Sequence, residues 1–345
     1  NIDRFMELKI PYLLNATVLD ITSDKVVTIC DPNGIVDIQA EVVVLAMGAR
    51  ERTRGNIGIP GNRCVGVWTA GNAQKYLNMD GYLVGKRIFI LGSGDIGLIM
   101  ARRLTLAKAK VIGVAEIMPY SNGLNRNIVQ CLLDYDIPLY LSTTITQIKG
   151  DGRVEAITLC KVDEQRRPIP ESAFDVQVDT VLLSVGLIPD NVLSEKAKVE
   201  LDPRTKGPKV DSALMTQVPG IFACGNVLHI HDLVVQVSME GRLVADSGLR
   251  YLNHDSSEKT VPITSAGALN YVLPQTLRKD SASVLLKYRV SKPMAKGILK
   301  ISSGDQVLLR VPKLDLHPSE MQTLQLSQAL LSKIDYNCVV ELCDE

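Results

Sequence analysis

The sequence lacks the features that mark several large classes of protein. Its 345 residues include 38 basic and 38 acidic side chains, so no net charge attracts nucleic acid or an anionic membrane surface. It has no apolar run of about 18 residues or more, and its first residues form neither the basic nor the apolar part of a secretory signal peptide. These absences exclude a nucleic-acid partner and membrane insertion, and they predict a cytoplasmic protein.

The spacing of the cysteines indicates neither a disulfide framework nor a redox-active dithiol. The seven cysteines are an odd number spread over a long chain, which argues against a disulfide framework, and none forms a Cys-x-x-Cys pair. The redox dithiol of a disulfide reductase is therefore missing. Cys338 and Cys343 have no histidine beside them, so no metal site is predicted, and Cys224 lies in an apolar run where plain packing is expected.

The most informative stretch is the segment from Lys86 to Glu116. An apolar run at 87–91 has the composition of a buried parallel strand, a helical pattern extends to Leu106, and a second apolar run covers 111–115. A glycine-rich turn with the pattern GxGxxG joins the first strand to the helix. The turn consists of Gly92, Ser93, Gly94, Asp95, Ile96 and Gly97.

Each glycine of this turn has a mechanical role in binding a dinucleotide. Gly92 permits the tight turn, Gly94 lets the backbone approach a pyrophosphate, and Gly97 lets the helix pack closely against the strand. The helix N-terminus then offers free N–H groups to the phosphates. A lone GxGxxG motif is weak evidence, but here a strand precedes it and a helix and a second strand follow it, which is the context that the motif requires.

An acidic residue ends the second strand of this unit. Glu116 lies nineteen residues after Gly97, where its carboxylate can accept hydrogen bonds from both hydroxyls of an adenosine ribose. No basic residue follows at 117–119 to receive a 2′-phosphate. The sequence therefore favours NAD, with NADP as the alternative.

The order of elements around this unit occurs twice. Residues 12–45 predict a meander of strands, and the apolar strand at 41–47 ends at Gly48. A second meander is predicted between 145 and 178, and it is followed by an apolar strand that ends at Gly186. Two copies of meander, apolar strand and glycine indicate a duplicated nucleotide-binding unit.

The register of this repeat predicts where a first phosphate-binding turn would lie. Gly92 precedes Gly186 by 94 residues, and the same interval counted back from Gly48 leads to a point about 46 residues before Asn1. We therefore expect the chain to be the remainder of a longer protein, with the fingerprint for its first dinucleotide absent.

Further motifs in the same order give the chain a resemblance to a known family. The motif GLIPDN at 186–191 is followed by PGIFACGN at 219–226 and by a helical pattern at 232–252. Over about residues 1–252 the chain resembles the two-dinucleotide FAD/NAD-dependent pyridine nucleotide oxidoreductases. Within that family, the stretches GARERTRGNIGIPG and NGLNRNIVQCLLD resemble bacterial NAD(FAD)-dependent dehydrogenases associated with glycerol-3-phosphate dehydrogenase-like subunits.

This resemblance implies both cofactors and the residues that would contact them. The glycine turn and Glu116 match the NAD fingerprint, whereas Gly225 and Asn226 stand where the family has Gly-Asp, whose acid holds the ribityl chain of FAD. Asn226 can still donate and accept hydrogen bonds. The helix from Asp232 corresponds to the one whose N-terminus faces the flavin pyrimidine and stabilises the charge of reduced flavin.

The function that the resemblance implies is hydride transfer between NAD(H) and FAD, coupled to a partner dehydrogenase subunit that oxidises a small-molecule substrate. The alternative is a truncated, catalytically silent module for NAD binding and protein interaction. A coding segment with GxGxxG upstream of Asn1 would separate the two. The sequence leaves the substrate, the electron acceptor and the oligomeric state open.

Other side chains near these motifs have two interpretations each. His229 and His231 flank the expected flavin edge and could transfer protons, but a hydrogen-bonded loop histidine is the more frequent case. Arg50, Arg52 and Arg54 follow a strand end in a ligand-facing loop, where one could meet an anionic substrate or a cofactor phosphate. Solvated arginines are equally expected there.

We expect an α/β protein with two Rossmann-like dinucleotide-binding domains, each with an inserted β-meander, and a small C-terminal β-sandwich. The FAD-type domain is expected to be discontinuous and N-terminally incomplete, and the sandwich is interpreted as a docking or structural module. Strands of the sandwich are predicted at 284–290, 296–302, 306–312 and 339–343. The expected parts are 1–78 and 192–252 for the FAD-type domain, 79–191 for the NAD-binding domain, 253–268 for a linker and 269–345 for the β domain.

Overall fold

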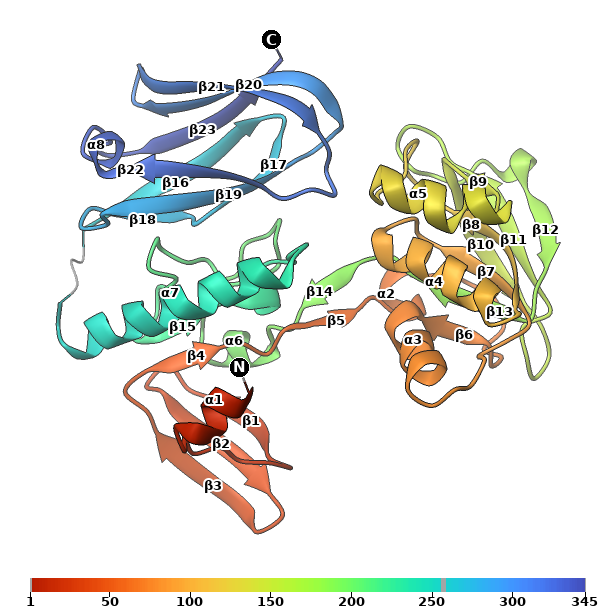
Figure 1. Cartoon of the computed structure of the whole chain (residues 1–345), viewed down its shortest axis with the longest axis horizontal. Helices are drawn as coiled ribbons and strands as arrows, with labels where there is room; N and C mark the ends of the chain where they lie inside the picture. The colour runs from red at the N-terminus through yellow and green to blue at the C-terminus, as the bar shows by residue number, and fades with distance from the viewer. Residues whose placement is uncertain (1, 256–258, 345) are drawn as a thin grey trace. The chain divides into compact units, whose positions relative to one another are not determined.

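The computed structural model describes residues 2–255 and 259–344, and the chain divides into two compact units (Figure 1). A discontinuous unit comprises Asn1–Ala49 and Pro189–Glu345, and a central unit comprises Arg50–Ile188. The chain passes from one to the other through the short strands β5 (Ala49–Glu51) and β14 (Leu187–Pro189). The predicted α/β class is confirmed. No helix in the described part of the chain is long and apolar enough to cross a membrane.

The central unit contains a five-stranded parallel sheet in the order β6-β13-β7-β8-β9. Ile88 and Ile90 of β7 belong to a core cluster with residues of the helices α3, α4 and α5, whereas Phe89 and Leu91 belong to a cluster with residues of the meander β10–β12. Because both faces are covered, the central strands are continuous apolar runs. The bounds are β6 Val67–Thr69, α3 Ala70–Asn78, β7 Arg87–Leu91, α4 Asp95–Leu106, β8 Lys110–Ala115, α5 Asn125–Cys131, β9 Leu139–Tyr140, β10 Thr143–Lys149, β11 Ala156–Lys161, β12 Phe174–Gln177 and β13 Thr180–Leu183.

The boundary of this unit differs from the predicted one. The sequence prediction placed residues 50–78 in the FAD-type domain, but β6 pairs in parallel with β13, and α3 packs into the same cluster as β7. The central unit therefore begins at Arg50 instead of residue 79. A three-residue strand carries too little periodicity to reveal a partner so far along the chain.

The nucleotide-type part of the discontinuous unit has a much smaller sheet. Strand β4 (Val43–Leu45) pairs in parallel with β15 (Ile221–Ala223), and in the described residues these two form a sheet of their own. β15 leads through the turn η3 (Gly225–Val227) into helix α7 (Val234–Leu252), which begins two residues after the predicted start at Asp232. The predicted meander is confirmed. The remaining bounds are α1 Ile2–Glu7, β1 Thr17–Ile21, β2 Val26–Asp31, β3 Gly34–Gln39 and α6 Val192–Lys196.

The C-terminal β domain belongs to the same unit and consists of two sheets around one core. Their strand orders are β18-β16-β23-β20-β21 and β17-β19-β22, so the predicted sandwich is confirmed. All four strands predicted for it are present as β19, β20, β21 and β23. The bounds are β16 Thr260–Gly267, β17 Leu269–Leu273, β18 Thr276–Arg278, β19 Ser283–Val290, β20 Met294–Ser303, β21 Gln306–Leu316, β22 Gln322–Ser327, α8 Gln328–Leu331 and β23 Cys338–Cys343.

The predicted linker at 253–268 is wrong over its second half. β16 occupies this stretch and pairs in parallel with β23 and antiparallel with β18. Val261 and Ile263 enter the core while their neighbours are exposed, so the alternation of a half-buried strand was present in a mostly polar sequence. Residues 256–258 of the predicted linker lie outside the described residues.

Candidate functional site

The predicted glycine turn lies where the sequence analysis placed it, between β7 and α4. Gly92 has a φ of +100°, and a Cβ on it would lie 2.1 Å from the carbonyl oxygen of Ser184. A Cβ on Gly97 would lie 2.4 Å from the carbonyl oxygen of Gly92, so these two glycines are required by close packing. A Cβ on Gly94, the N-cap of α4, would meet no heavy atom within 4 Å. The space over Gly94 is thus open, as a pyrophosphate site needs.

Glu116 is bound to the turn itself. Its side chain is buried, its Oε2 accepts hydrogen bonds from the backbone N (3.0 Å) and Oγ (2.8 Å) of Ser93, and its Oε1 accepts one from the backbone N of Met118 (3.1 Å). These donors fix the carboxylate at the end of β8. A ribose would therefore meet an acid whose position is set in advance, but which shares its lone pairs with the turn.

The two other side chains of the turn differ in role. Asp95 accepts hydrogen bonds at Oδ1 from the backbone N of Leu124 (2.9 Å) and from Nδ2 of Asn127 (2.6 Å), so it ties α4 to the start of α5. Ile96 is exposed at the edge of the turn. Asp95 is thus a structural residue of the site, a role that the spacing of the motif did not reveal.

A cavity of about 880 Å³ opens in the same unit, which is within the size range of roughly 300–1,000 Å³ found for small-molecule sites. It is lined by the segment before β6, by β6 itself, by Asn72 at the start of α3 and by Leu183 at the end of β13. Since the strands are parallel, the ends of β6 and β13 lie at the same edge of the sheet as the glycine turn. The sequence analysis did not predict this cavity, because its lining comes from a Gly/Pro-rich loop without periodicity.

The three arginines of this loop differ. Arg54 lines the cavity, and its guanidinium donates to the backbone oxygens of Ile59 (2.9 Å) and Asn62 (2.6 Å). Arg50 and Arg52 are exposed. Arg54 therefore shapes the loop, and it is the one of the three that reaches the cavity.

Gly48 and Gly186 end their apolar strands in equivalent ways. Both have a positive φ, at +77° and +91°. The carbonyl oxygen of Gly48 accepts from the backbone N of Asp190, and that of Gly186 accepts from the backbone N of Arg52, each at 3.1 Å. The two glycines thus keep the same backbone role in both copies of the repeat.

The second glycine turn follows β15. Gly225 has a φ of +72°, and its backbone N donates to Oε2 of Glu240 on α7 at 2.6 Å. Asn226 accepts at Oδ1 from the backbone N of His231 (3.1 Å), and its Oδ1 lies 3.2 Å from Nδ1 of the same histidine. The carbonyl end of Asn226 is therefore engaged within the loop, which leaves its amide N–H groups as the end that can donate to a ligand.

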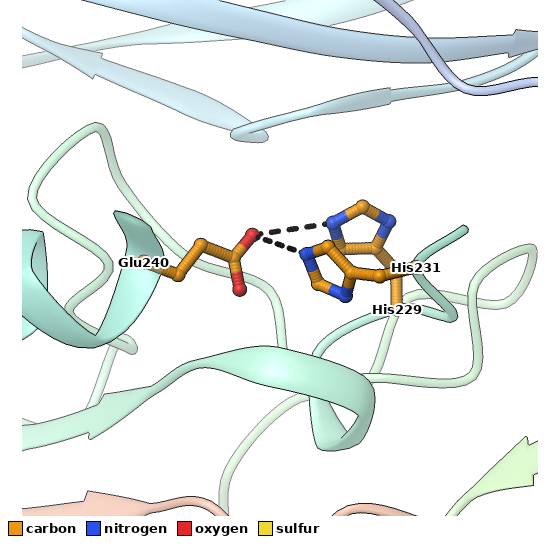
Figure 2. A group of neighbouring side chains, drawn as sticks. All are labelled: His229, His231 and Glu240. Carbon is orange, nitrogen blue, oxygen red and sulfur yellow. Dashed lines mark hydrogen bonds and ion pairs between the residues drawn. The ribbon is translucent and has the colours of Figure 1, made fainter. Parts of the chain in front are cut away.

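His229, His231 and Glu240 form a buried cluster (Figure 2). Oε1 of Glu240 lies 3.3 Å from Nε2 of His229 and 2.9 Å from Nε2 of His231, and all three side chains are at most 2% exposed. Nε2 of His231 lies at this short distance from Oε1 of Glu240, but it has no hydrogen-bond partner among the described residues. The interpretation of His229 as a hydrogen-bonded loop residue fits its surroundings.

The protonation of this cluster follows from burial and neighbouring charge. Burial lowers the pKa of His229 to about 4, against the opposing effect of Glu240, so His229 is neutral at pH 7. Burial alone would raise the pKa of Glu240, but the two imidazoles and the ammonium of Lys287 hold it well below its usual range. Glu240 is therefore an anion among neutral and positive groups.

Two imidazoles and a carboxylate are also a donor set that zinc uses, and the ligand atoms of this cluster lie within 4.8 Å of one another. The cluster does not fit a metal ion, however, because Nζ of Lys287 already contacts Oε1 of Glu240. A divalent cation would have to share the carboxylate with a buried ammonium group. We therefore assign no metal to it.

The comparisons with known proteins agree with this geometry. The family model of pyridine nucleotide-disulphide oxidoreductases matches residues 3–241, which is more than half of the chain, so the chain belongs to this family. Membership implies FAD and NAD(P) as the cofactors of the family.

Two bacterial relatives illustrate the similarity. An NADH oxidase of Streptococcus pneumoniae is 30% identical over 151 residues, which cover 42% of this chain and 30% of the relative. A subunit of the alkyl hydroperoxide reductase of Pseudomonas aeruginosa is 28% identical over 226 residues, which cover 64% of this chain and 40% of the relative. The chain thus spans less than half the length of these two relatives.

Solved structures share the fold. Thioredoxin reductase of T. acidophilum superimposes with a TM-score of 0.53 at 22% identity, over 70% of this chain and 74% of that one. An FAD-dependent pyridine nucleotide-disulphide oxidoreductase of Desulfovibrio vulgaris gives a TM-score of 0.54 at 18% identity, over 94% of this chain and 81% of that one. The architecture is therefore that of the two-dinucleotide flavoproteins.

Proposed function

We propose that this chain transfers hydride between NAD(H) and FAD. The observation that carries the proposal is the turn 92–97, where a Cβ on Gly94 would meet open space at the N-terminus of α4 while Glu116 is fixed beside it. The chemistry would be that of the cofactors, and the chain would supply binding and orientation. Titration calorimetry with NADH, on wild type and Gly94→Val, tests the nucleotide site.

The favoured nucleotide is NADH. Its ribose hydroxyls can donate to the Glu116 carboxylate, whereas the 2′-phosphate of NADPH would bring a second anion to the same place. The three donors that fix Glu116 support this preference, because the acid cannot turn away without losing them. Equal or tighter binding of NADPH in the same titration would contradict the assignment.

For FAD, the described residues support contacts at one end only. Gly225, Asn226 and the segment that runs through Asp232 into α7 would contact the isoalloxazine and ribityl parts. Within residues 2–49 no strand runs through a glycine turn into a helix, so nothing described there matches the element that holds a pyrophosphate. We infer that the FAD site of this chain is incomplete.

Exposed apolar groups support the same inference. Val44 of β4 is 45% exposed, although the strands of parallel sheets are usually buried on both faces. On α7, Val235, Met239 and Leu243 follow one another at helical spacing and are all exposed. These surfaces are where further elements of a larger sheet would pack.

A partner protein would oxidise the organic substrate. Three relatives are named as single subunits of larger enzymes, which are an alkyl hydroperoxide reductase, a hydrogen cyanide synthase and an opine oxidase. A glycerol-3-phosphate dehydrogenase-like partner is the specific form of this proposal, and a small molecule would be its substrate. Reconstitution of substrate oxidation from the two purified proteins, but from neither alone, is the expected result.

The second candidate function is a catalytically silent module for NAD binding and interaction. The two-stranded sheet of β4 and β15 favours it, because it offers little support for a second dinucleotide. Transfer of electrons from NADH to a dye in the presence of added FAD separates the candidates. Steady turnover supports the oxidoreductase, and NADH binding without turnover supports the silent module.

A further inference from the structure

Polar side chains of the C-terminal β domain contact the segment that carries the second glycine turn and the helix that follows it. Lys287 on β19 is 8% exposed, and its Nζ contacts Oε1 of Glu240. Arg289, two residues further on the same face of the strand, contacts Oδ1 of Asp232 and donates to the backbone oxygen of Ile230 (3.2 Å). One strand of the sandwich thus contacts both α7 and the loop that precedes it.

The second carboxylate oxygen of Asp232 also binds the β domain. Oδ2 of Asp232 accepts from the backbone N of Met321 at 2.7 Å, in the connection before β22. The predicted start of the flavin-facing helix is therefore a residue held from two points of the β domain.

Arg289 is also linked to Glu240 through Tyr271 and His229, and the direction of each hydrogen bond in this series can be assigned. Arg289 can only donate, so its Nε donates to the Tyr271 hydroxyl at 3.1 Å. The hydroxyl then donates a hydrogen bond to Nδ1 of His229 (3.3 Å), and it stays protonated because burial raises the pKa of Tyr271. His229 must carry its proton on Nε2, which faces Oε1 of Glu240 at 3.3 Å.

Glu240 connects these side chains to the glycine turn at Gly225. Its Oε1 meets Lys287 and His229, and its Oε2 accepts from the backbone N of Gly225. The carboxylate is buried and anionic, so it needs a positive partner to stay in place, and Lys287 is that partner. Without Lys287 the acid would be an uncompensated buried charge directly behind Gly225.

We infer that Lys287 and Arg289 are positioning residues through which the β domain holds the segment Gly225–Asp232 in the conformation that meets a flavin. The inference rests on the proposed function for the role of the segment, but not for the contacts. The sandwich is therefore a part of the cofactor site, beyond the docking or structural module that the sequence suggested.

Hydrogen–deuterium exchange of the full chain tests the inference without any nucleotide. Lys287→Met should raise exchange of three amides by at least about tenfold: that of Gly225, which donates to Glu240, and those of Leu228 and His231, which donate within the segment. Lys287→Arg keeps the charge and should stay within about twofold of wild type. The matched control is Lys300→Met on β20, where the lysine forms a longer ion pair (3.8 Å) with a partly exposed Glu341 and should have no effect on the segment.

Two results would overturn the inference. Unchanged exchange at 225–231 in Lys287→Met would mean that Glu240 needs no partner. Faster exchange of the strands β20 and β21 to the same degree would mean that the lysine only stabilises the sandwich as a whole. The ¹⁵N resonances of His229 give a second signature, because wild type at pH 7 should show the neutral form with the proton on Nε2, and any other form would contradict the assigned hydrogen bonds.

Quenching of riboflavin fluorescence separates this inference from the proposed function. Riboflavin carries the isoalloxazine and ribityl parts without the pyrophosphate. Wild type and Lys287→Arg should bind it, and Lys287→Met should bind it at least about tenfold more weakly. If wild type fails to bind riboflavin while the exchange results hold, the flavin contact of the proposed function is wrong, but Lys287 still holds the segment Gly225–Asp232 through Glu240.

Discussion

The two nucleotide-type parts of this chain repeat the same order of elements, yet each holds its glycine turn in a different way. In the central unit the turn 92–97 is held by elements adjacent in sequence, β7, α4 and β8, and by Glu116 at the end of β8. In the discontinuous unit the turn at Gly225 follows a two-stranded sheet, and side chains from the distant β domain hold it through Glu240. A short glycine motif therefore defines a site only together with the groups that fix its backbone.

The two units can also be observed separately. All four histidines lie in the discontinuous unit, whereas the single tryptophan, Trp68, lies on β6 of the central unit. Tryptophan fluorescence therefore follows the central unit, and histidine resonances follow the other.

The largest expected effect is the difference in cofactor retention. The 345-residue chain should bind NADH, but it should be colourless after incubation with FAD and desalting, because only the isoalloxazine end of FAD has contacts to offset its ordering. A stoichiometric flavin spectrum from the 345-residue chain would place a complete FAD site within it.

Next in size is the loss of NADH binding in Gly94→Val. The added side chain would occupy the space that the pyrophosphate needs, so calorimetry should show affinity reduced by at least about a hundredfold. The fold should be unaffected, since a Cβ there meets nothing within 4 Å. Gly241→Val on α7 of the other unit is the matched control, because a Cβ there also meets nothing within 4 Å, and it should bind NADH like wild type. Retained affinity in Gly94→Val would show that the glycine serves only the turn.

A smaller change is expected in nucleotide preference. Glu116→Gln keeps an acceptor for Ser93 but removes the charge, so NADH should bind severalfold more weakly and NADPH more tightly than to wild type. Glu116→Arg should move preference further toward NADPH. Parallel titrations with both nucleotides measure the ratio, and a ratio that is the same in all three proteins would remove Glu116 from the ribose site.

The smallest expected effect is a dependence of stability on pH in one unit only. His229 has a folded-state pKa of about 4, below its ordinary 6.5, so the unfolded chain binds the extra proton first and stability falls as pH falls through that window. Between pH 7 and 5 this amounts to about 2 kcal/mol. Glu240, with its pKa also lowered, adds a loss of stability below its ordinary pKa of 4.5.

Urea unfolding at pH 7 and pH 5 checks this effect, with exchange at the discontinuous unit and Trp68 fluorescence at the central unit as separate probes. The loss should occur in the discontinuous unit and should largely disappear in His229→Gln. The same loss seen by Trp68 fluorescence would show that the two units do not unfold independently, and a loss that persists in His229→Gln would remove the assignment to His229.

Much of the central unit could be predicted because its signals are local. The apolar run of β7, the glycine spacing and the helical period of α4 lie within about twenty consecutive residues, and a parallel strand buried on both faces needs no alternation to be recognised. The strands β19, β20 and β21 of the sandwich were predictable for the same reason, since each has its own alternation and the last two are joined by a tight turn. These features require only the period of the side chains and the chemistry of glycine.

The tertiary structure alone decided what depends on partners far along the chain. The pairing of β6 with β13 moved the domain boundary, and the pairing of β16 with β23 turned a predicted linker into a strand. Lys287 and Glu240 are 47 residues apart, and their contact stabilises a buried charge. No sequence pattern around either residue predicts this contact. Periodicity shows which face of an element is apolar, but it does not say which other element will cover that face, because that choice is made by packing across the whole unit.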